Sequence, residues 1–449
     1  MPLPCSGAAL SDNPSSPIYR LLGGGTPTSV ARGGLIKIGS STALAQIAAL
    51  AATPILSRLY APSALGVLAT IVSMATVFMA AASLKIEAAT TLVDSHTEAG
   101  WTTRLSLIVA GNTSLVLLLG LLVGESTGVL GTSPLRYWSA TIPIIVFLGS
   151  SFAVLTQLCL REREYGQIAS RAVYQSYGTF GAQIGLGFIW AGPAGLILGQ
   201  VFGRAIGIAS LARRNKAWQG RPPAGTYGRI LKRYWRFPVV FATSAFLNAL
   251  GLMAPLLFVA WHFGPGSAGQ LAMAQRVMLA PVALCASAVA PVFAAELTSR
   301  IRRKQVIRHV YVKVSGVLAP LGLAVGLLAA FVVPHVLPGL LGPRWGEVGP
   351  FVTIMSATIA LQLVASPLSY VFLALEKTKL SIALDLGRFG TLLGAIVATI
   401  HFEWNIQSSV LWMYSGLAAI YLTTWAFGLH AVRTHDIDTQ RLNEGPAKL

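Results

Sequence analysis

The sequence predicts an all-α polytopic membrane protein with about 12 transmembrane helices, arranged as two six-helix halves around a central cavity. Its 449 residues are 54% hydrophobic and only 11% charged, with a mean hydropathy of +0.66, which excludes an ordinary soluble domain. Apolar segments of about 20 residues, enough to cross a bilayer as a helix, recur along the chain. A one-sided distribution of Lys and Arg predicts the orientation, and a short internal repeat supports the division into halves.

The order of the elements follows from where these apolar segments fall. Residues 1–34 are rich in Gly, Pro and Ser without a sustained apolar core, so we expect a disordered cytosolic tail rather than a signal peptide. We then expect a six-helix bundle at 35–212, a basic cytosolic linker at 213–237, a second bundle at 238–432 and a cytosolic tail at 433–449. The predicted spans are 35–56, 64–83, 103–123, 139–160, 173–190, 194–211, 239–261, 269–295, 310–334, 349–373, 380–402 and 409–432.

The positive charges predict the orientation. With the N-terminus in the cytosol, 27 of the 33 Lys and Arg residues lie on the cytosolic side, and the outside loops contain only Arg58, Arg136 and Arg344. Both termini are therefore expected in the cytosol. The net charge of +18 then reflects topology rather than nucleic-acid binding. The basic, aromatic-rich linker is expected to lie against anionic membrane lipids, and not to bind RNA.

A short repeat relates the two halves. The sequence YAPSALGVLA from Tyr60 matches FGPGSAGQLA from Phe263 at a constant offset of 203 residues. The identical pairs are Pro62/Pro265, Gly66/Gly269, Leu68/Leu271 and Ala69/Ala272. Both copies fall at the turn between the first and second span of a six-span half. We therefore expect the halves to share one orientation, related by an axis along the membrane normal.

Several motifs resemble those of the bacterial oligosaccharide flippases, the Wzx-like polysaccharide transport family of a larger multidrug and oligosaccharidyl-lipid exporter superfamily. They are FP at 237–238, FLNALGLMAP at 246–255, FGPGSAGQLAMAQRVMLAP at 263–281, SRLYAPSALGVLA at 57–69 and LKIEAATTL at 84–92. Together they cover about an eighth of the chain. Where that family typically has Arg-Tyr-Glu at the end of the second span, this sequence has KIE at 85–87.

The resemblance implies a function. It implies a flippase of the bacterial inner membrane that moves a polyprenyl-pyrophosphate-linked oligosaccharide to the periplasmic leaflet by alternating access. The product would serve surface polysaccharide or exopolysaccharide assembly, with a polysaccharide polymerase and other assembly proteins as partners. The chain has no phosphate-binding loop, so an ion gradient rather than ATP is the expected driving force. No cofactor is expected.

Polar residues within the apolar spans are the candidate substrate-binding groups. Gln46 and Asn248 lie in the first span of each half, and Gln275 and Arg276 lie in the eighth. Neither Arg276 nor Arg204 has an acidic residue three or four positions away. An unpaired arginine in a span requires a wet cavity or an anionic ligand, so we expect these two to form the anion site. The alternative for Arg276 is snorkelling to the nearer membrane surface.

Three charged residues are candidates for ion coupling. Asp385 and Arg388 are three residues apart on one face of the eleventh span, where they are expected to neutralise one another. A proton or cation relay is the alternative. Glu87, with Lys85, closes the second span and is the third candidate.

Other classes of function find less support. The sequence has no GxSxG motif, no Asp-x-Asp pair and no His/Cys cluster, and its cysteines lack metal-ligand spacing, so we expect neither an enzyme nor a metal protein. A multidrug or small-solute antiporter is the main alternative, although Asp385 is the only acidic residue well inside a span. A membrane glycosyltransferase or polymerase lacks the expected carboxylates. A function as a non-transporting scaffold stays an open alternative.

Overall fold

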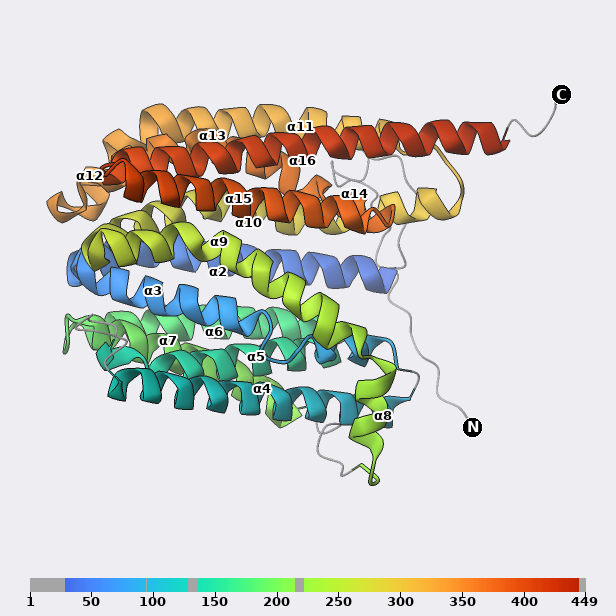
Figure 1. Ribbon diagram of the computed structural model, residues 1–449, viewed down its shortest axis with the longest axis horizontal. Helices are drawn as coiled ribbons and strands as arrows, with labels where there is room; N and C mark the ends of the chain where they lie inside the picture. The colour runs from blue at the N-terminus through green and yellow to red at the C-terminus, as the bar shows by residue number, and fades with distance from the viewer. Residues whose placement is uncertain (1–28, 94, 128–135, 215–221, 444–449) are drawn as a thin grey trace, which may run out of the picture.

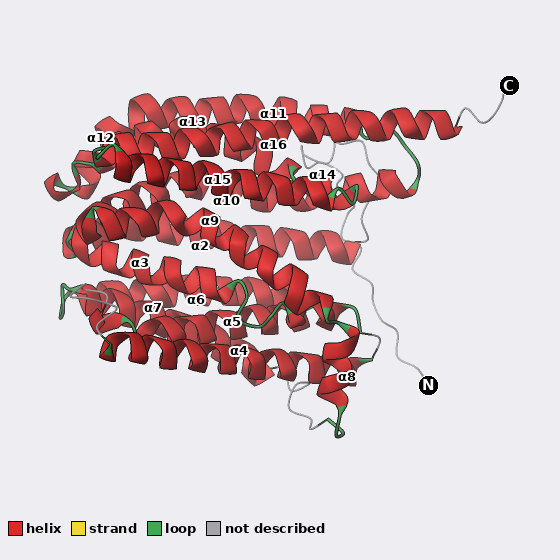
Figure 2. Cartoon of the chain, viewed as in Figure 1, coloured by secondary structure: helices red, strands yellow, loops and turns green. Residues whose placement is uncertain are grey.

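The structure is a computed structural model that describes residues 29–93, 95–127, 136–214 and 222–443. These ranges contain helices and connecting loops and no strand, as Figure 2 shows. The helices of the first half are α2 (Ser29–Leu59), α3 (Pro62–Met79), α4 (His96–Ser126), α5 (Thr141–Arg161), α6 (Tyr165–Gly187) and α7 (Pro193–Arg214), with short 3-10 turns η1 (Ile86–Thr91) and η2 (Arg136–Trp138).

The second half contains the two longest helices, α10 and α16. In Figure 1, α11, α13 and α16 form one edge of the molecule, α4 and α5 form the other, and α2, α3, α9 and α10 lie between them. The elements are η4 (Phe237–Phe241), α9 (Ala242–His262), α10 (Gly264–Arg302), α11 (Arg308–Leu327), η5 (Leu328–Val332), α12 (Val333–Leu341), η6 (Pro343–Trp345), α13 (Val348–Leu368), α14 (Tyr370–Ala374), α15 (Thr378–His401) and α16 (Ile406–Asn443).

The predicted fold class is confirmed. Each predicted span coincides with one helix, or with consecutive helices such as α11 and α12, and ten of the described helices are long and apolar enough to cross a membrane. The two exceptions are the fifth and sixth spans. The apolar part of α7 is shorter, at Pro193–Ala209. The mean hydropathy of helix α6 is too low for a membrane span by composition alone, because polar side chains lie along it. They include Gln167, Arg171, Gln175 and Gln183.

The helical ends differ from the predicted boundaries. Helix α2 begins at Ser29, inside the predicted tail 1–34; the residues before it lie outside the described part of the chain. Helix α16 continues to Asn443, well into the predicted tail 433–449. It stays helical there because one face is buried, including Val432 and Asp436.

The described part of the predicted linker contains the amphipathic helix α8 (Thr226–Arg233). Ile230 on its apolar face is buried with Ile86 and Leu105 of the first half, and Arg233 pairs with Glu98 at 3.8 Å. Binding of its basic face to lipid headgroups stays a prediction.

The two halves meet most closely at the repeated motif. The backbones approach so closely that a Cβ on Gly66 would lie 1.7 Å from the Pro265 carbonyl oxygen, and one on Gly269 would lie 1.8 Å from that of Pro62. Only glycine fits at either position. Nearby, the indole Nε1 of Trp345 donates to the Ser57 carbonyl at 2.9 Å. We call this the glycine end of the bundle.

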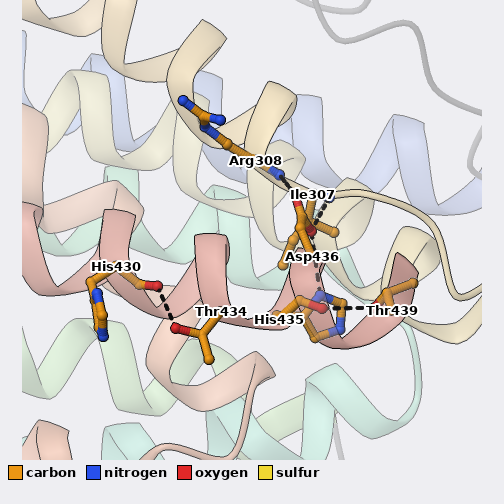
Figure 3. Close-up of polar contacts among 7 residues, drawn as sticks. All are labelled: Ile307, Arg308, His430, Thr434, His435, Asp436 and Thr439. Carbon is orange, nitrogen blue, oxygen red and sulfur yellow. Dashed lines mark hydrogen bonds and ion pairs between the residues drawn. The ribbon is translucent and has the colours of Figure 1, made fainter. Parts of the chain in front are cut away.

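The opposite end, which we call the basic end, contains α8, the α10–α11 connection and the end of α16 (Figure 1). The Asp436 carboxylate on α16 accepts the backbone N–H groups of Ile307 and Arg308, each at 2.8 Å (Figure 3). These N–H groups belong to the first turn of α11 and have no partner within that helix. Asp436 therefore caps α11 from a different helix and fixes α16 against it.

We predict that Asp436→Ala destabilises the protein by about 1–2 kcal/mol, the usual cost of losing a helix N-cap. Thermal unfolding of the purified protein in detergent measures the effect. Asp438→Ala is the matched control, because Asp438 lies two residues away on the exposed face of α16. Equal losses in the two variants would contradict the capping role.

Candidate functional site

A polar cavity of about 280 Å³ lies within the second half, between α9, α13, α14, α15 and α16. It is lined by amide, hydroxyl and charged side chains from all but α14, together with Phe372 of that helix. The polar lining residues are Asn248, Gln362, Ser366, Ser369, Ser381, Asp385, Arg388, Tyr421 and Thr424. Three of the predicted site residues, Asn248, Asp385 and Arg388, thus share one cavity.

Helical periodicity explains how distant sequence segments build this lining. Gln362, Ser366 and Ser369 follow one another at four and three residues, so they lie along one face at the end of α13. Ser381, Asp385 and Arg388 show the same spacing along α15. The α13 residues are not among the site residues predicted from the sequence, although this spacing of polar residues in an apolar span is a usable signal.

Arg388 is the centre of the polar contacts in this cavity. One of its terminal nitrogens donates to Asn248 Oδ1 at 2.9 Å and lies 3.4 Å from Asp385 Oδ1. Its guanidinium carbon lies 5.7 Å from the centre of the Tyr421 ring. The Asp385 side chain is 41% exposed and that of Arg388 is 14% exposed. The expected pairing is therefore present, and the carboxylate faces the cavity where a proton or a polar ligand can reach it.

The neighbouring residue pair Gln275 and Arg276 diverges. Gln275 Nε2 donates to the Tyr414 hydroxyl at 2.7 Å, which ties α10 to α16 inside the second half. Arg276 instead faces the first half, where a terminal nitrogen donates to the Ala49 carbonyl of α2 at 3.3 Å. Its guanidinium carbon also lies 4.8 Å from the centre of the Phe180 ring of α6. Gln46 lies one turn before Ala49 on α2.

Arg204 occupies a different place. Its terminal nitrogen lies 3.6 Å from the Met79 sulfur of α3, and a Cβ at Gly149 of α5 would come within 2.6 Å of it. Arg204 thus packs among helices of the first half, whereas Arg276 contacts α2 and α6. Among the described residues the two arginines have no partner in common, and the single anion site expected from the sequence stays a prediction.

A further arginine lies deeper than the sequence predicts. The predicted spans place Arg171 among the positive charges of a cytosolic connection, but it is 1% exposed on α6. It donates to the Thr156 hydroxyl of α5 at 2.7 Å and lies over the Phe152 ring. Helix α6 begins eight residues before the predicted span 173–190, which draws this side chain into the bundle.

Glu87 lies away from the polar cavity, in η1 of the first half. It is buried, accepts a hydrogen bond from the Ser83 hydroxyl at 2.6 Å and pairs with Lys85 at 3.9 Å. In the described part of the chain, no group of three or more His, Cys, Asp or Glu residues is placed to hold a metal ion.

Comparison with known proteins identifies a family match. The family model described as "Polysaccharide biosynthesis protein" matches residues 55–350, about two thirds of the chain. No curated protein matches the sequence.

Solved structures share the fold at low sequence identity. An inward-facing multidrug resistance MATE transporter of the MOP superfamily aligns with a TM-score of 0.64 and 14% identity, covering 90% of this chain and 96% of its own. A MOP superfamily transporter from Pyrococcus furiosus gives 0.57 and 13%, covering 94% and 99%. A mutant form of the Vibrio cholerae MATE transporter VcmN gives 0.57 and 15%, covering 91% and 99%. These similarities establish the fold alone.

We predict that Asp385→Asn lowers stability by about 1 kcal/mol, because Arg388 loses its counter-charge while the half-exposed carboxylate was already partly screened. The double variant Asp385→Asn with Arg388→Gln should recover most of this loss. Thermal unfolding in detergent compares the three proteins. If the double variant also restores normal transport, the role of the pair is structural. If Asp385→Asn is as stable as the unmodified protein, the ion pair contributes nothing to the stability of the fold.

Proposed function

We propose a transport function for this chain from the premise that it belongs to the polysaccharide biosynthesis protein family, whose model matches residues 55–350. The proposed substrate is a polyprenyl-diphosphate-linked oligosaccharide. The protein moves this lipid across the bacterial inner membrane by alternating access, and a polysaccharide polymerase or other assembly proteins use the product. The chain acts as a carrier and no catalytic step is assigned to it.

The observation on which the substrate class depends is the position of Arg276. This guanidinium lies where α10 meets α2 and α6, so it faces the contact between the two halves. No carboxylate of the described residues pairs with it; its partners are one carbonyl oxygen and one aromatic ring. A charge placed within a membrane span costs about 2.5–3.5 kcal/mol, which favours an anionic ligand as the missing partner. A guanidinium holds phosphate oxygens in a bidentate fork.

The glycine contact supports alternating access. It joins the halves through backbone atoms at the glycine end, using repeat-related residues. In the proposed cycle the halves separate at this contact when they close at the basic end, and they return to it when the basic end opens. Since the one-sided charge distribution favours a cytosolic basic end, the structure corresponds in this proposal to a state closed toward the periplasm.

Ion coupling is assigned in this proposal to Asp385. Its carboxylate is the acidic group of the polar cavity, and its ion pair with Arg388 would weaken on protonation. The same guanidinium also connects α15 to α9 through Asn248, so a change in its pairing would reach the contact between these two helices. Glu87 is a weaker candidate because Ser83 and Lys85 already engage it.

A multidrug antiporter is the second candidate function. Transporters with this name share the fold. A cationic drug requires an unpaired carboxylate, however, and Asp385 is paired with Arg388. Arg276 at the contact between the halves also repels a cation, so we favour the anionic lipid substrate.

We predict that Gly66→Ala opens the glycine end, because the added methyl carbon cannot fit 1.7 Å from the Pro265 carbonyl oxygen. The readout is labelling of Ser57→Cys by a membrane-impermeant maleimide on whole cells, with the native cysteines replaced. Labelling should rise about tenfold or more, since a change of about 1.4 kcal/mol in the free-energy difference between the closed and open states changes the population of the open state tenfold.

Gly316→Ala serves as the control for this experiment, because a Cβ at Gly316 meets nothing within 4 Å. Unchanged labelling in Gly66→Ala would show that the contact does not hold the end closed. Labelling that occurs only from the cytosolic side would reverse the proposed orientation.

We predict that Arg276→Ala and Arg276→Lys both reduce flipping about tenfold or more, because lysine cannot form the bidentate fork and a charged hydrogen bond contributes about 1.5–3 kcal/mol. Proteoliposomes with a fluorescent lipid-linked oligosaccharide measure the rate. Arg58→Ala, which removes an exposed arginine near the glycine end, is the control. Full activity of well-inserted Arg276→Ala would overturn the assignment.

A further inference from the structure

A second opening lies at the basic end, outside the polar cavity of the second half. It has a volume of about 500 Å³ and lies between the last turns of α10 and the short helix α14. Two guanidinium groups and three hydroxyl groups line it. These belong to Arg302 and Arg303, and to Thr298, Ser299 and Tyr370. The volume suits a polar headgroup of the size of small-molecule ligands.

The charge in this opening is not neutralised by the protein. Both Arg302 and Arg303 are exposed, and neither pairs with a carboxylate of the described residues. Their neighbour Arg300 differs, since its Nε lies 2.5 Å from Glu296 Oε1. The acidic side chain available on this stretch of α10 is thus used by the arginine outside the opening. The two arginines inside are left as unpaired cations beside hydroxyl donors.

The opening lies at the level of lipid headgroups. Helix α10 has 39 residues, and a helix of that length spans about 58 Å at 1.5 Å per residue. A bilayer with its headgroups is about 40–45 Å thick, so the last turns of α10 extend into or beyond the headgroup layer. An anion that fits here can remain attached to a lipid tail.

Helix α14 connects this opening to the polar cavity. Tyr370 lines the opening, while Phe372 of the same short helix, with Ser369 just before it, lines the cavity that contains Asp385 and Arg388. A headgroup held at Arg302 and Arg303 would therefore lie next to a second polar space. A saccharide linked to that headgroup would lie near the amide and hydroxyl side chains that line the polar cavity on the other side of α14.

We infer that the Arg302–Arg303 opening is a docking site for the diphosphate of the lipid-linked substrate, which binds here before it enters the contact between the halves. A diphosphate diester has one negative charge on each phosphate, which two guanidinium groups neutralise as bidentate partners. The Ser299 and Tyr370 hydroxyls donate to the remaining oxygens, whereas the Thr298 hydroxyl already donates to the Ala294 carbonyl at 2.8 Å. This inference rests on the proposed function and adds a loading site to it.

Binding of farnesyl diphosphate to the full chain in phosphatidylcholine nanodiscs tests the inference. Arg302→Gln with Arg303→Gln should weaken binding about tenfold or more, as expected for lost charged hydrogen bonds. The matched control is Lys304→Gln with Arg308→Gln, which removes the same charge from the same connection. Both control side chains are exposed and outside the opening, and Asp436 contacts only the Arg308 backbone. Equal weakening in the two double variants would overturn the inference.

A second arm separates substrate from bulk lipid. Nanodiscs containing phosphatidylglycerol should leave farnesyl diphosphate binding within about twofold, because a phosphate diester carries one negative charge, too few to neutralise both guanidinium groups. If phosphatidylglycerol abolishes binding, the opening is a site for anionic phospholipid, and the inference fails.

Transport kinetics separate this inference from the proposed function. In proteoliposomes, the Arg302→Gln and Arg303→Gln double variant should raise KM for the lipid-linked oligosaccharide and leave kcat within about twofold. If the wild-type protein does not flip this lipid, the proposed function fails. If it does and the double variant has an unchanged KM, only the docking site is refuted.

Discussion

The arrangement of this protein depends on the backbone contact between the two halves at Gly66 and Gly269. Each glycine faces the proline carbonyl of the other copy of the repeat, at a separation that leaves no space for a side chain. Small residues let transmembrane helices approach closely, and close approach gives the packing that holds helices together in lipid. Because the contact is made by repeat-related residues, it lies on the axis relating the halves.

The polar residues of the spans illustrate how a membrane protein accommodates charge. Arg388 is held by Asn248 and Asp385, Arg171 by the Thr156 hydroxyl and an aromatic ring, and Arg276 by one carbonyl. These solutions are not equivalent. A carboxylate neutralises the charge, whereas a carbonyl or a ring only solvates it. Arg171, Arg204 and Arg276 have no carboxylate partner among the described residues, and of these three Arg276 is the one at the contact between the halves.

The basic end is built by helices that are longer than a bilayer requires. Helices α10 and α16 contain 39 and 38 residues, and their ends extend past the span that hydropathy alone defines. Asp436 fastens the end of α16 to the start of α11, so this region is ordered by specific hydrogen bonds. The same helical extension of α10 ends in Arg300 and Arg302, which lie in its last turn. From the sequence we expected connecting loops and a tail at the basic end. In the structure, helical ends and specific hydrogen bonds form this surface.

The sequence by itself determined the spans and the repeat, because length and hydropathy are local properties of a helix in lipid. It also identified Asp385 and Arg388 as a pair, since residues three apart share a helix face. Only the tertiary structure decided which residues meet across helices. Asn248 joins Arg388 from 140 residues away, and the predicted partners Arg204 and Arg276 lie against different helices. Gln275 and Arg276 are neighbours that point about 100° apart on α10, so one reaches α16 and the other α2. Which helix each of these two side chains contacts depends on how the helices pack, and a local sequence pattern does not contain that information.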